Sequence, residues 1–339
     1  MSISEHSLKN SLIFVHYTEN SIKIVKVGSL FCWKIIFYNL LLKNKLMINP
    51  SEFIHPEDSA ALQQLESIPG FPALVKKVLA LGLEQMQYGV NMATAIRLSP
   101  TQLPKLYNHL PPICNKLGIA EPEFYLQMDP MPNAWTFGDT KIYITITSGL
   151  VELLDDEELD SVIAHECGHI LCRHVLYHTL AKYILSGADY LGILGTLALP
   201  IKYAILYWYR KSELSCDRCA SIITSPEVVA RTMARIAGGP KDITKNINMY
   251  EWALQADKYD EIRNDGLWNK ALQIAVIAEQ DHPFSAVRVR EILKWGDTPQ
   301  YRNFVVNMKA LGSGNKCSSC GNFVSPDWKF CKHCGQKLQ

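Results

Sequence analysis

A His-Glu-x-x-His motif at residues 165–169 constrains this chain more than any other feature of its sequence. The acidic run 155–158 precedes it, with Asp where a helix cap is expected and Glu in the first turn, where the helix dipole favours negative charge. Residues four apart on a helix lie on the same face, one turn above each other. We therefore predict a helix on which His165 and His169 bind one Zn²⁺ together.

Glu166 follows the first histidine, where a carboxylate can take a proton from a metal-activated water without filling a coordination position. A structural zinc site needs no such acid and normally has four protein ligands. The motif alone would arise by chance in about one chain in a hundred of this composition. The sequence around the motif strengthens its interpretation as a zinc site, because a later polar helix supplies Glu213 and, one turn on, Asp217. These two suit a third ligand and an acceptor for a ligand histidine.

Three blocks of the chain occur in an order typical of one enzyme family. They are NAWTFGDTKIYITITSGLVELLDDEELDSVIAHECGH (133–169), RKSELSCDRCA (210–220) and HPFSAVRVREI (282–292). Together they resemble the gluzincin endopeptidases, which include the Ste24-type CAAX prenyl proteases, the heat-shock protease HtpX and the Oma-type proteases. The resemblance covers residues 120 to 295 and implies zinc-dependent cleavage of peptide bonds.

The resemblance also implies a role for individual residues. It implies that zinc is bound by His165, His169 and Glu213, that Glu166 is the general base and acid, that Asp217 orients a ligand histidine and that His282 assists as an electrophile. On the residues alone, the alternative is that His282 caps or packs the helix that Pro283 begins. Cys216 stands where the family usually has Ala, and its CxxC with Cys219 is better explained by packed small residues than by a redox pair.

The periodicity of the chain predicts an α+β fold, mostly helical, with a small sheet before the motif helix. The predicted parts are an N-terminal extension (1–46), a helical leader (47–120), the zinc metallopeptidase domain (121–300), a linker (301–316) and a zinc ribbon (317–339). The extension differs in composition from the rest of the chain. An alternative hypothesis is that Met47 is the natural start, since the residues after it suit a mature terminus.

The segment KIYITITSG (141–149) alternates as a β-strand does. We expect an extended peptide substrate to pair with residues 141–147, because backbone hydrogen bonds would hold the scissile bond at a fixed height over the metal. The residues expected along the substrate strand are Asn133, Ala134, Tyr143 and Thr145. The alternative is that this strand is a purely structural edge.

The C-terminal cysteines have the spacing of a structural zinc site. Cys317-x-x-Cys320 is followed after ten residues by Cys331-x-x-Cys334, and a glycine follows each pair. Two such knuckles present four thiolates to one ion, so we predict a Cys₄ zinc ribbon, which a segment this small needs in order to fold. The cofactors expected are thus one catalytic and one structural zinc. Lysines and aromatic residues in the ribbon suit a protein partner better than nucleic acid.

Charge and cysteine usage limit the other possibilities. A net charge of +1 with 20% charged residues gives no global basic field, so we expect no binding of duplex nucleic acid. The remaining cysteines are scattered through apolar or helical sequence, as free thiols are in a reducing compartment. We therefore expect a cytoplasmic location. These cysteines are Cys32, Cys114, Cys167, Cys172, Cys216 and Cys219.

The apolar segment 190–207 raises the question of a membrane. His169 and Glu213 must reach the same zinc, so an odd number of spans between them is excluded. Gly192, Gly195 and Pro200 also interrupt the run. We expect a buried or membrane-touching helical hairpin, which allows peripheral membrane association.

Two other classes of function remain open. In one, the zinc sites only hold the fold of an adaptor or binding protein that acts through its ribbon. In the other, the ribbon binds nucleic acid, which would give a salt-sensitive affinity. Glu166 and the open coordination position favour a zinc-dependent endopeptidase acting on polypeptides.

Overall fold

The computed structural model describes residues 15–18, 21–24, 48–71, 75, 82–185, 199–264, 266, 284–312, 319, 330 and 335–338. The chain divides into two units, Met1–Ile48 and Asn49–Gln339. In the first unit, β1 (Val15–Thr18) and β2 (Ser21–Ile24) pair as an antiparallel hairpin. A natural start at Met47 stays a prediction.

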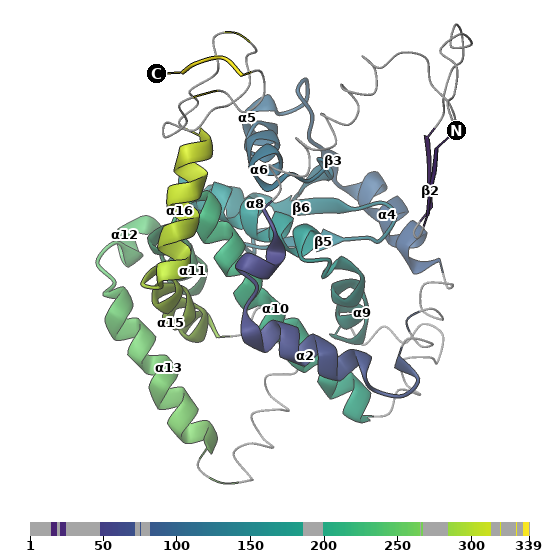
Figure 1. Ribbon diagram of the computed structural model, residues 1–339. Coiled ribbons are helices and arrows are strands. Elements are labelled where there is room, and N and C mark those ends of the chain that lie inside the picture. The colour runs from purple at the N-terminus through teal and green to yellow at the C-terminus, as the bar shows by residue number, and fades with distance from the viewer. Residues whose placement is uncertain are drawn as a thin grey trace, which may run out of the picture. The chain divides into compact units, whose positions relative to one another are not determined.

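The second unit is mostly helical, which confirms the predicted fold class (Figure 1). Its described helices are η1 (Pro50–Glu52), α2 (Pro56–Glu66), α4 (Leu83–Thr94), α5 (Pro104–Tyr107), α6 (Leu110–Leu117), α7 (Ser148–Leu153), α8 (Asp156–Leu171), α9 (Val175–Leu185), α10 (Leu199–Ile223), α11 (Pro226–Gly238), α12 (Lys241–Thr244), α13 (Met249–Asn264), α15 (Ser285–Gly296) and α16 (Pro299–Gly312).

A four-stranded sheet lies beside α8, with the strand order β3-β4-β6-β5. The strands are β3 (Ile96–Arg97), β4 (Glu123–Gln127), β5 (Ala134–Phe137) and β6 (Tyr143–Thr147). β6 runs parallel to β4 and antiparallel to β5, so both of its hydrogen-bonding edges are used.

The prediction that a substrate pairs with residues 141–147 is therefore wrong. All five residues of β6, including the proposed substrate residues Tyr143 and Thr145, are buried. A β-branched run buried on both faces is typical of an interior strand, and alternation alone does not distinguish it from an edge. The sheet edge next to α8 is β5.

The start of α8 is fixed as the sequence predicts. Asp155 caps the helix and forms a capping box with Glu158. Oε1 of Glu158 also accepts hydrogen bonds from Nε of Arg231 at 2.9 Å and from Nε of Arg235 at 3.1 Å. Both arginines belong to α11, so the buried Glu158 carboxylate joins the two helices and fixes the position of the motif helix.

Gly168 allows α8 to approach α10 closely. A Cβ atom at this position would lie 3.0 Å from Cβ of Cys219 and 3.2 Å from Cα of Cys216, which is tighter than ordinary contacts between side chains. The glycine inside the motif therefore brings the helix that carries the histidines next to the helix that carries Glu213.

Helix α10 packs on α8, α9 and α2 (Figure 1). Ile205 and Leu206 on α10 are buried in a core cluster with Leu65 of α2, which explains part of the apolar segment 190–207. Residues 190–198 lie outside the described part. None of the helices in the described ranges is both long and apolar enough to cross a membrane.

Candidate metal centre and active site

His165 and His169 lie one turn apart on α8, and both are buried. Their Nε2 atoms point to the carboxylate of Glu213 on α10. The distance is 3.3 Å from His165 to Oε2 and 3.4 Å from His169 to Oε1. The three residues predicted as ligands are thus brought together from two helices that the Gly168 contact holds close.

The three donor atoms fit a zinc ion. Two nitrogen or oxygen ligands about 2.0–2.1 Å from a tetrahedral Zn²⁺ lie about 3.4 Å apart, close to the separations found here. Nε2 of His165 is buried without a hydrogen-bond partner among the described residues, as a metal-binding nitrogen would be before the metal binds. Two imidazoles and a carboxylate are also a donor set that suits zinc.

The charges around the site favour a cation. Burial would raise the pKa of Glu213, but the charges of His165 and Arg288 hold it well below its usual range. Burial also opposes the charge of Asp217, and the Arg288 guanidinium together with His165 lowers its pKa. Burial lowers the pKa of His169, which keeps this imidazole neutral and able to bind a metal.

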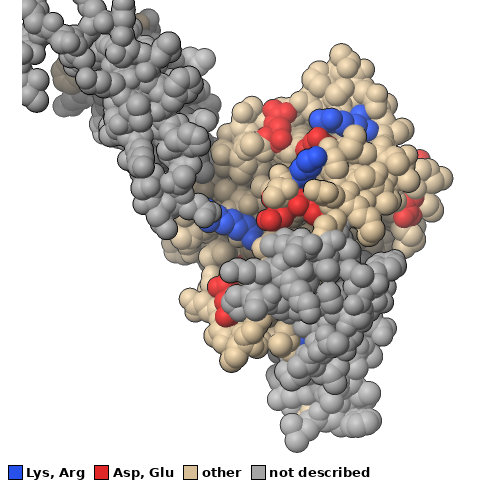
Figure 2. All heavy atoms as spheres, turned by 90° about the vertical axis from the view of Figure 1, so that its right-hand side faces the viewer, with Lys and Arg blue, Asp and Glu red and all other residues tan. Residues whose placement is uncertain are grey.

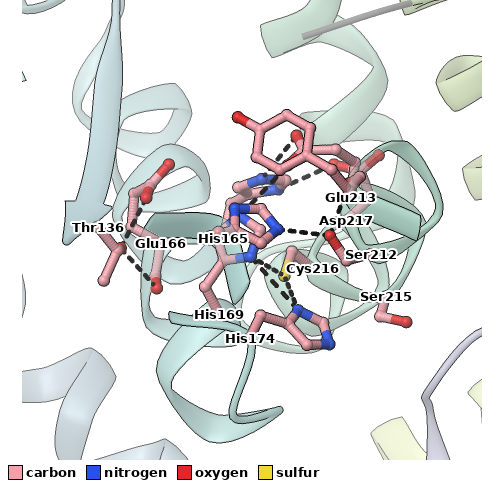
Figure 3. Close-up of polar contacts among 12 residues, drawn as sticks. Thr136, His165, Glu166, His169, His174, Ser212, Glu213, Ser215, Cys216 and Asp217 are labelled. Atoms are coloured by element: carbon pink, nitrogen blue, oxygen red, sulfur yellow. Dashed lines mark hydrogen bonds and ion pairs between the residues drawn. The ribbon is translucent and has the colours of Figure 1, made fainter. Parts of the chain in front are cut away.

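Asp217 contacts the outer nitrogen of His165. Its Oδ1 lies 3.0 Å from Nδ1 of His165, which leaves Nε2 of that histidine for the metal (Figure 3). Arg288 of α15 then holds Asp217, with Nη2 2.6 Å from Oδ1 and Nε 2.8 Å from Oδ2. Sequence reasoning gave Arg288 no role, although it is the arginine of the late block HPFSAVR (282–288).

Glu166 points toward β5, on the other side of the two imidazoles from Glu213 and Asp217 (Figure 3). Its Oε2 accepts a hydrogen bond of 2.7 Å from Oγ1 of Thr136, which also reaches the backbone oxygen of Glu166. This contact orients the carboxylate and leaves Oε1 to take up a proton. Thr136 was missed, because nothing in a β-strand pattern marks one threonine among several.

Four further side chains lie near His169 or contact its neighbours: Cys216, His174, Asp58 and His178. Sequence reasoning assigned no role to the last three and no contact with His169 to Cys216. Nδ1 of His169 lies 3.1 Å from Sγ of Cys216 and 3.4 Å from Nδ1 of His174. His174 contacts Asp58, and His178 lies beside His169. Cys216 faces Nδ1 of His169, while Glu213 faces Nε2 of both histidines, so Glu213 completes the metal site better. Cys216 and Cys219 are buried free thiols.

A cavity of about 70 Å³ adjoins the site, with His165 and Glu166 in its wall. Its apolar lining includes Leu150, Val162, Val229 and Met233. Pro132, Asn133 and Ala134, at the start of β5, also line it. The cavity therefore places an apolar surface beside the atoms that would carry out the chemistry.

Several predicted site residues lie outside the described part of the chain. They are His282 and the four ribbon cysteines Cys317, Cys320, Cys331 and Cys334. Their roles stay predictions. Asn133 and Ala134 are described, and Oδ1 of Asn133 accepts a hydrogen bond of 2.8 Å from the backbone N–H of Ala134.

Comparison with known proteins gives two family matches. Residues 102–296 match peptidase family M48, and residues 313–338 match a zinc-ribbon domain. The plastoglobule-localized metallopeptidase 48 of Arabidopsis thaliana chloroplasts is 31% identical over 263 residues, which cover 76% of each chain. A protease HtpX homologue of Tropheryma whipplei (strain Twist) is 34% identical over 130 residues, which cover 36% of this chain and 44% of the homologue. No solved structure matches the chain significantly.

Proposed function

We propose, on the premise that this chain belongs to peptidase family M48 and carries a C-terminal zinc-ribbon domain, that it is a zinc-dependent endopeptidase. The observation that carries the proposal is the convergence of His165, His169 and Glu213 at zinc-ligand separations, with Glu166 beside them and an apolar cavity next to both. The two histidines and Glu213 would hold the ion, which when bound polarises a carbonyl oxygen and acidifies water.

The chain's own residues then perform the proton transfers. Glu166 takes the proton of the attacking water and returns it to the leaving amine, as a positioned carboxylate can. Thr136 keeps one carboxylate oxygen of Glu166 fixed while the other handles the proton. Asp217 accepts the Nδ1 proton of His165 and so orients that ligand, and Arg288 keeps Asp217 charged.

The substrate is a polypeptide that lies along the edge strand β5. The backbone N–H of Thr147 on the β6 side donates to the backbone oxygen of Asn133 at 3.0 Å. In an antiparallel ladder alternate residues face the partner strand, so the backbone groups of Ala134 and Thr136 face the outer edge of the described sheet. An extended peptide can add there as another strand. Of the four residues proposed for the substrate strand, Asn133 and Ala134 keep that role.

The apolar cavity would receive one substrate side chain next to the scissile bond. Leu150, Val162 and Met233 in its lining suit an aliphatic side chain better than a charged one. The cavity thus adds some selectivity to backbone pairing. His282 keeps its proposed role as an electrophilic helper of the same site.

The ribbon would bind a second, structural zinc through Cys317, Cys320, Cys331 and Cys334 and dock a protein partner. On the face seen in Figure 2, acidic and basic side chains of the described residues are mixed within a larger uncharged area, so this face does not favour nucleic acid as a ligand. Five described cysteines, all free, support a cytoplasmic location. Membrane association through 190–207 stays part of the proposal.

Cleavage of casein with and without a metal chelator tests the proposed function. We expect cleavage by the zinc-loaded protein, its loss with 1,10-phenanthroline and its return on adding zinc. The rival function is a zinc-stabilised adaptor, which would leave casein and a broad peptide library intact even when fully loaded. That outcome would overturn the proposal.

A further inference from the structure

We propose that Asp58 of helix α2 is a positioning residue of the metal centre, which acts through His174 to hold His169 ready to bind the metal. The inference rests on the proposed function, since it gives His169 the role of a ligand. It adds an element that the family match does not contain, because Asp58 lies before the matched residues 102–296.

Asp58 is fully buried, and each of its oxygens has a partner. Nε1 of Trp208 donates to Oδ1 at 3.0 Å, and Oγ of Ser215 donates to Oδ2 at 2.5 Å. Nε2 of His174 lies 3.1 Å from Oδ2, although its N–H approaches obliquely. Burial would raise the pKa of Asp58, but these contacts with His174, Ser215 and Trp208 lower it, so the side chain is a carboxylate that can only accept.

One arrangement of protons satisfies this chain of contacts from Asp58 to His169. Because the carboxylate of Asp58 can only accept, His174 carries its proton on Nε2 and presents the lone pair of Nδ1. That lone pair lies 3.4 Å from Nδ1 of His169. A histidine that binds a metal through Nε2 carries its proton on Nδ1, and this proton needs an acceptor. His174 provides it. Sγ of Cys216, a weaker acceptor, lies 3.1 Å from Nδ1 of His169 and 3.7 Å from Nδ1 of His174 (Figure 3).

Two hydrogen bonds join the residues that lead into α2 to α10, close to the contact between Asp58 and His174. The backbone N–H of His55 donates to Oγ of Ser215 at 2.9 Å, and Nη1 of Arg218 donates to the backbone oxygen of Phe53 at 3.2 Å. Asp58 thereby serves His169 as Asp217 serves His165, but across one intervening imidazole. The helix that precedes the matched family domain becomes part of the metal centre.

A rival explanation is a second metal ion, since His169, His174 and His178 could hold one. The contacts of His178 limit how it could bind such an ion. Its Nε2 lies 2.6 Å from Oγ of Ser212, and that hydroxyl donates its own proton to the backbone oxygen of Tyr209 at 2.7 Å. Nε2 of His178 therefore carries a proton and donates to Ser212, so only Nδ1 of this histidine could bind a metal, and the metal count in the test below decides.

The test measures the zinc dissociation constant of the catalytic site in the full-length chain by chelator competition. The change Asp58→Asn keeps the acceptor for Trp208 and removes the one for His174. We expect it to weaken zinc binding by about 10- to 100-fold, as the loss of a contact behind a ligand does. The matched control is Glu66→Gln at the other end of α2, whose carboxylate accepts a hydrogen bond from Tyr177 on α9, and its zinc affinity should stay within about threefold of the wild type. Asp217→Asn is the positive control: it should also weaken zinc binding, because Asp217 contacts the predicted ligand His165.

A second pair of variants distinguishes positioning from packing. His174→Phe keeps the ring beside Trp208 but removes both nitrogens, and should weaken zinc binding as much as Asp58→Asn. Because the two residues act in series, the double variant should lose no more affinity than His174→Phe alone. In the cobalt-loaded protein, both single variants should change the visible absorption in the same way relative to the wild type, since the ribbon is identical in all of them.

The outcomes are distinguishable. Glu213→Ala removes the predicted third ligand. If the wild type binds no more zinc than Glu213→Ala does, the proposed function fails. If it binds that metal but Asp58→Asn binds it equally well, the positioning role is overturned. Equal losses in Glu66→Gln, or additive losses in the double variant, would assign Asp58 to packing alone. A third metal equivalent that disappears in His178→Ala would also overturn the inference. If Asp58→Asn does not fold, His174→Phe decides by the same measurements.

Discussion

Arg288 holds both carboxylate oxygens of Asp217, with Nη2 2.6 Å from Oδ1 and Nε 2.8 Å from Oδ2. Its third nitrogen, Nη1, lies 3.2 Å from Oε2 of Glu213. One buried arginine of α15 thus balances the charge of the proposed third ligand and of the residue that orients His165. The proposed metal centre thus draws its residues from α8, α10 and α15.

The change Arg288→Met should destabilise the metal-free protein strongly. It leaves two buried carboxylates without their main counter-charge, which costs about 3–5 kcal/mol in the free energy of unfolding. The matched control is Arg290→Met on the same helix, whose partners Asp257 and Asp260 are more exposed, so its loss should be about 0–1 kcal/mol. Urea unfolding followed by circular dichroism measures both. Equal losses would show that Arg288 has no special part in the site.

Replacing Glu166 by Gln should leave the metal bound and remove the base. The ligands His165, His169 and Glu213 are untouched, and Gln can still accept the hydrogen bond from Thr136. We expect zinc content equal to the wild type and kcat lowered by at least about 10²-fold. Elemental analysis and peptide hydrolysis on the same preparation check this. Full activity of the zinc-loaded variant would remove Glu166 from the mechanism.

Zinc binding at the catalytic site should release about one proton at neutral pH. Burial would lower the pKa of His165, but the charge of Glu213 and the contact with Asp217 outweigh it and raise the pKa to about 9. Metal-free His165 is therefore protonated below pH 9, whereas a metal ligand must be neutral. Affinity should rise about tenfold per pH unit between pH 7 and 9 and level off above pH 9.

Calorimetry in two buffers of different ionisation enthalpy measures this proton. The four ribbon cysteines are replaced by serine, so that only the catalytic site contributes. An affinity that stays constant between pH 7 and 9 would contradict the assignment of the proton to His165.

Elemental analysis of the full-length protein should find two zinc ions per chain. Deleting residues 315–339 should remove one of them, because this segment contains all four ribbon cysteines. The truncated protein should keep its catalytic zinc and its activity on casein if the ribbon only docks a partner. A single zinc in the intact, fully loaded chain would refute one of the two sites.

The sequence predicts what is local and misses what is brought together by packing. The capped helix, the pair His165 and His169, and the contact of Asp217 with His165 follow from spacing along one helix or from the resemblance. Asp58, Thr136 and Arg288 reach the site from other elements, and periodicity does not say which side chains of those elements will meet it. The interior position of β6 was missed for the same reason, since strand order depends on pairing between distant segments.

The edge strand β5 offers a test of how the substrate binds. The backbone N–H of Ala134 donates to the Asn133 side chain, and it faces the edge where a peptide would add. Ala134→Pro removes this N–H but no bond of the β5–β6 ladder, and edge strands tolerate proline at such positions. Losing one backbone hydrogen bond should lower kcat/KM by about 2- to 10-fold, mainly through KM. Ala134→Ser keeps the N–H and should act as the wild type; if both variants cleave equally well, the substrate does not pair with β5 at this residue.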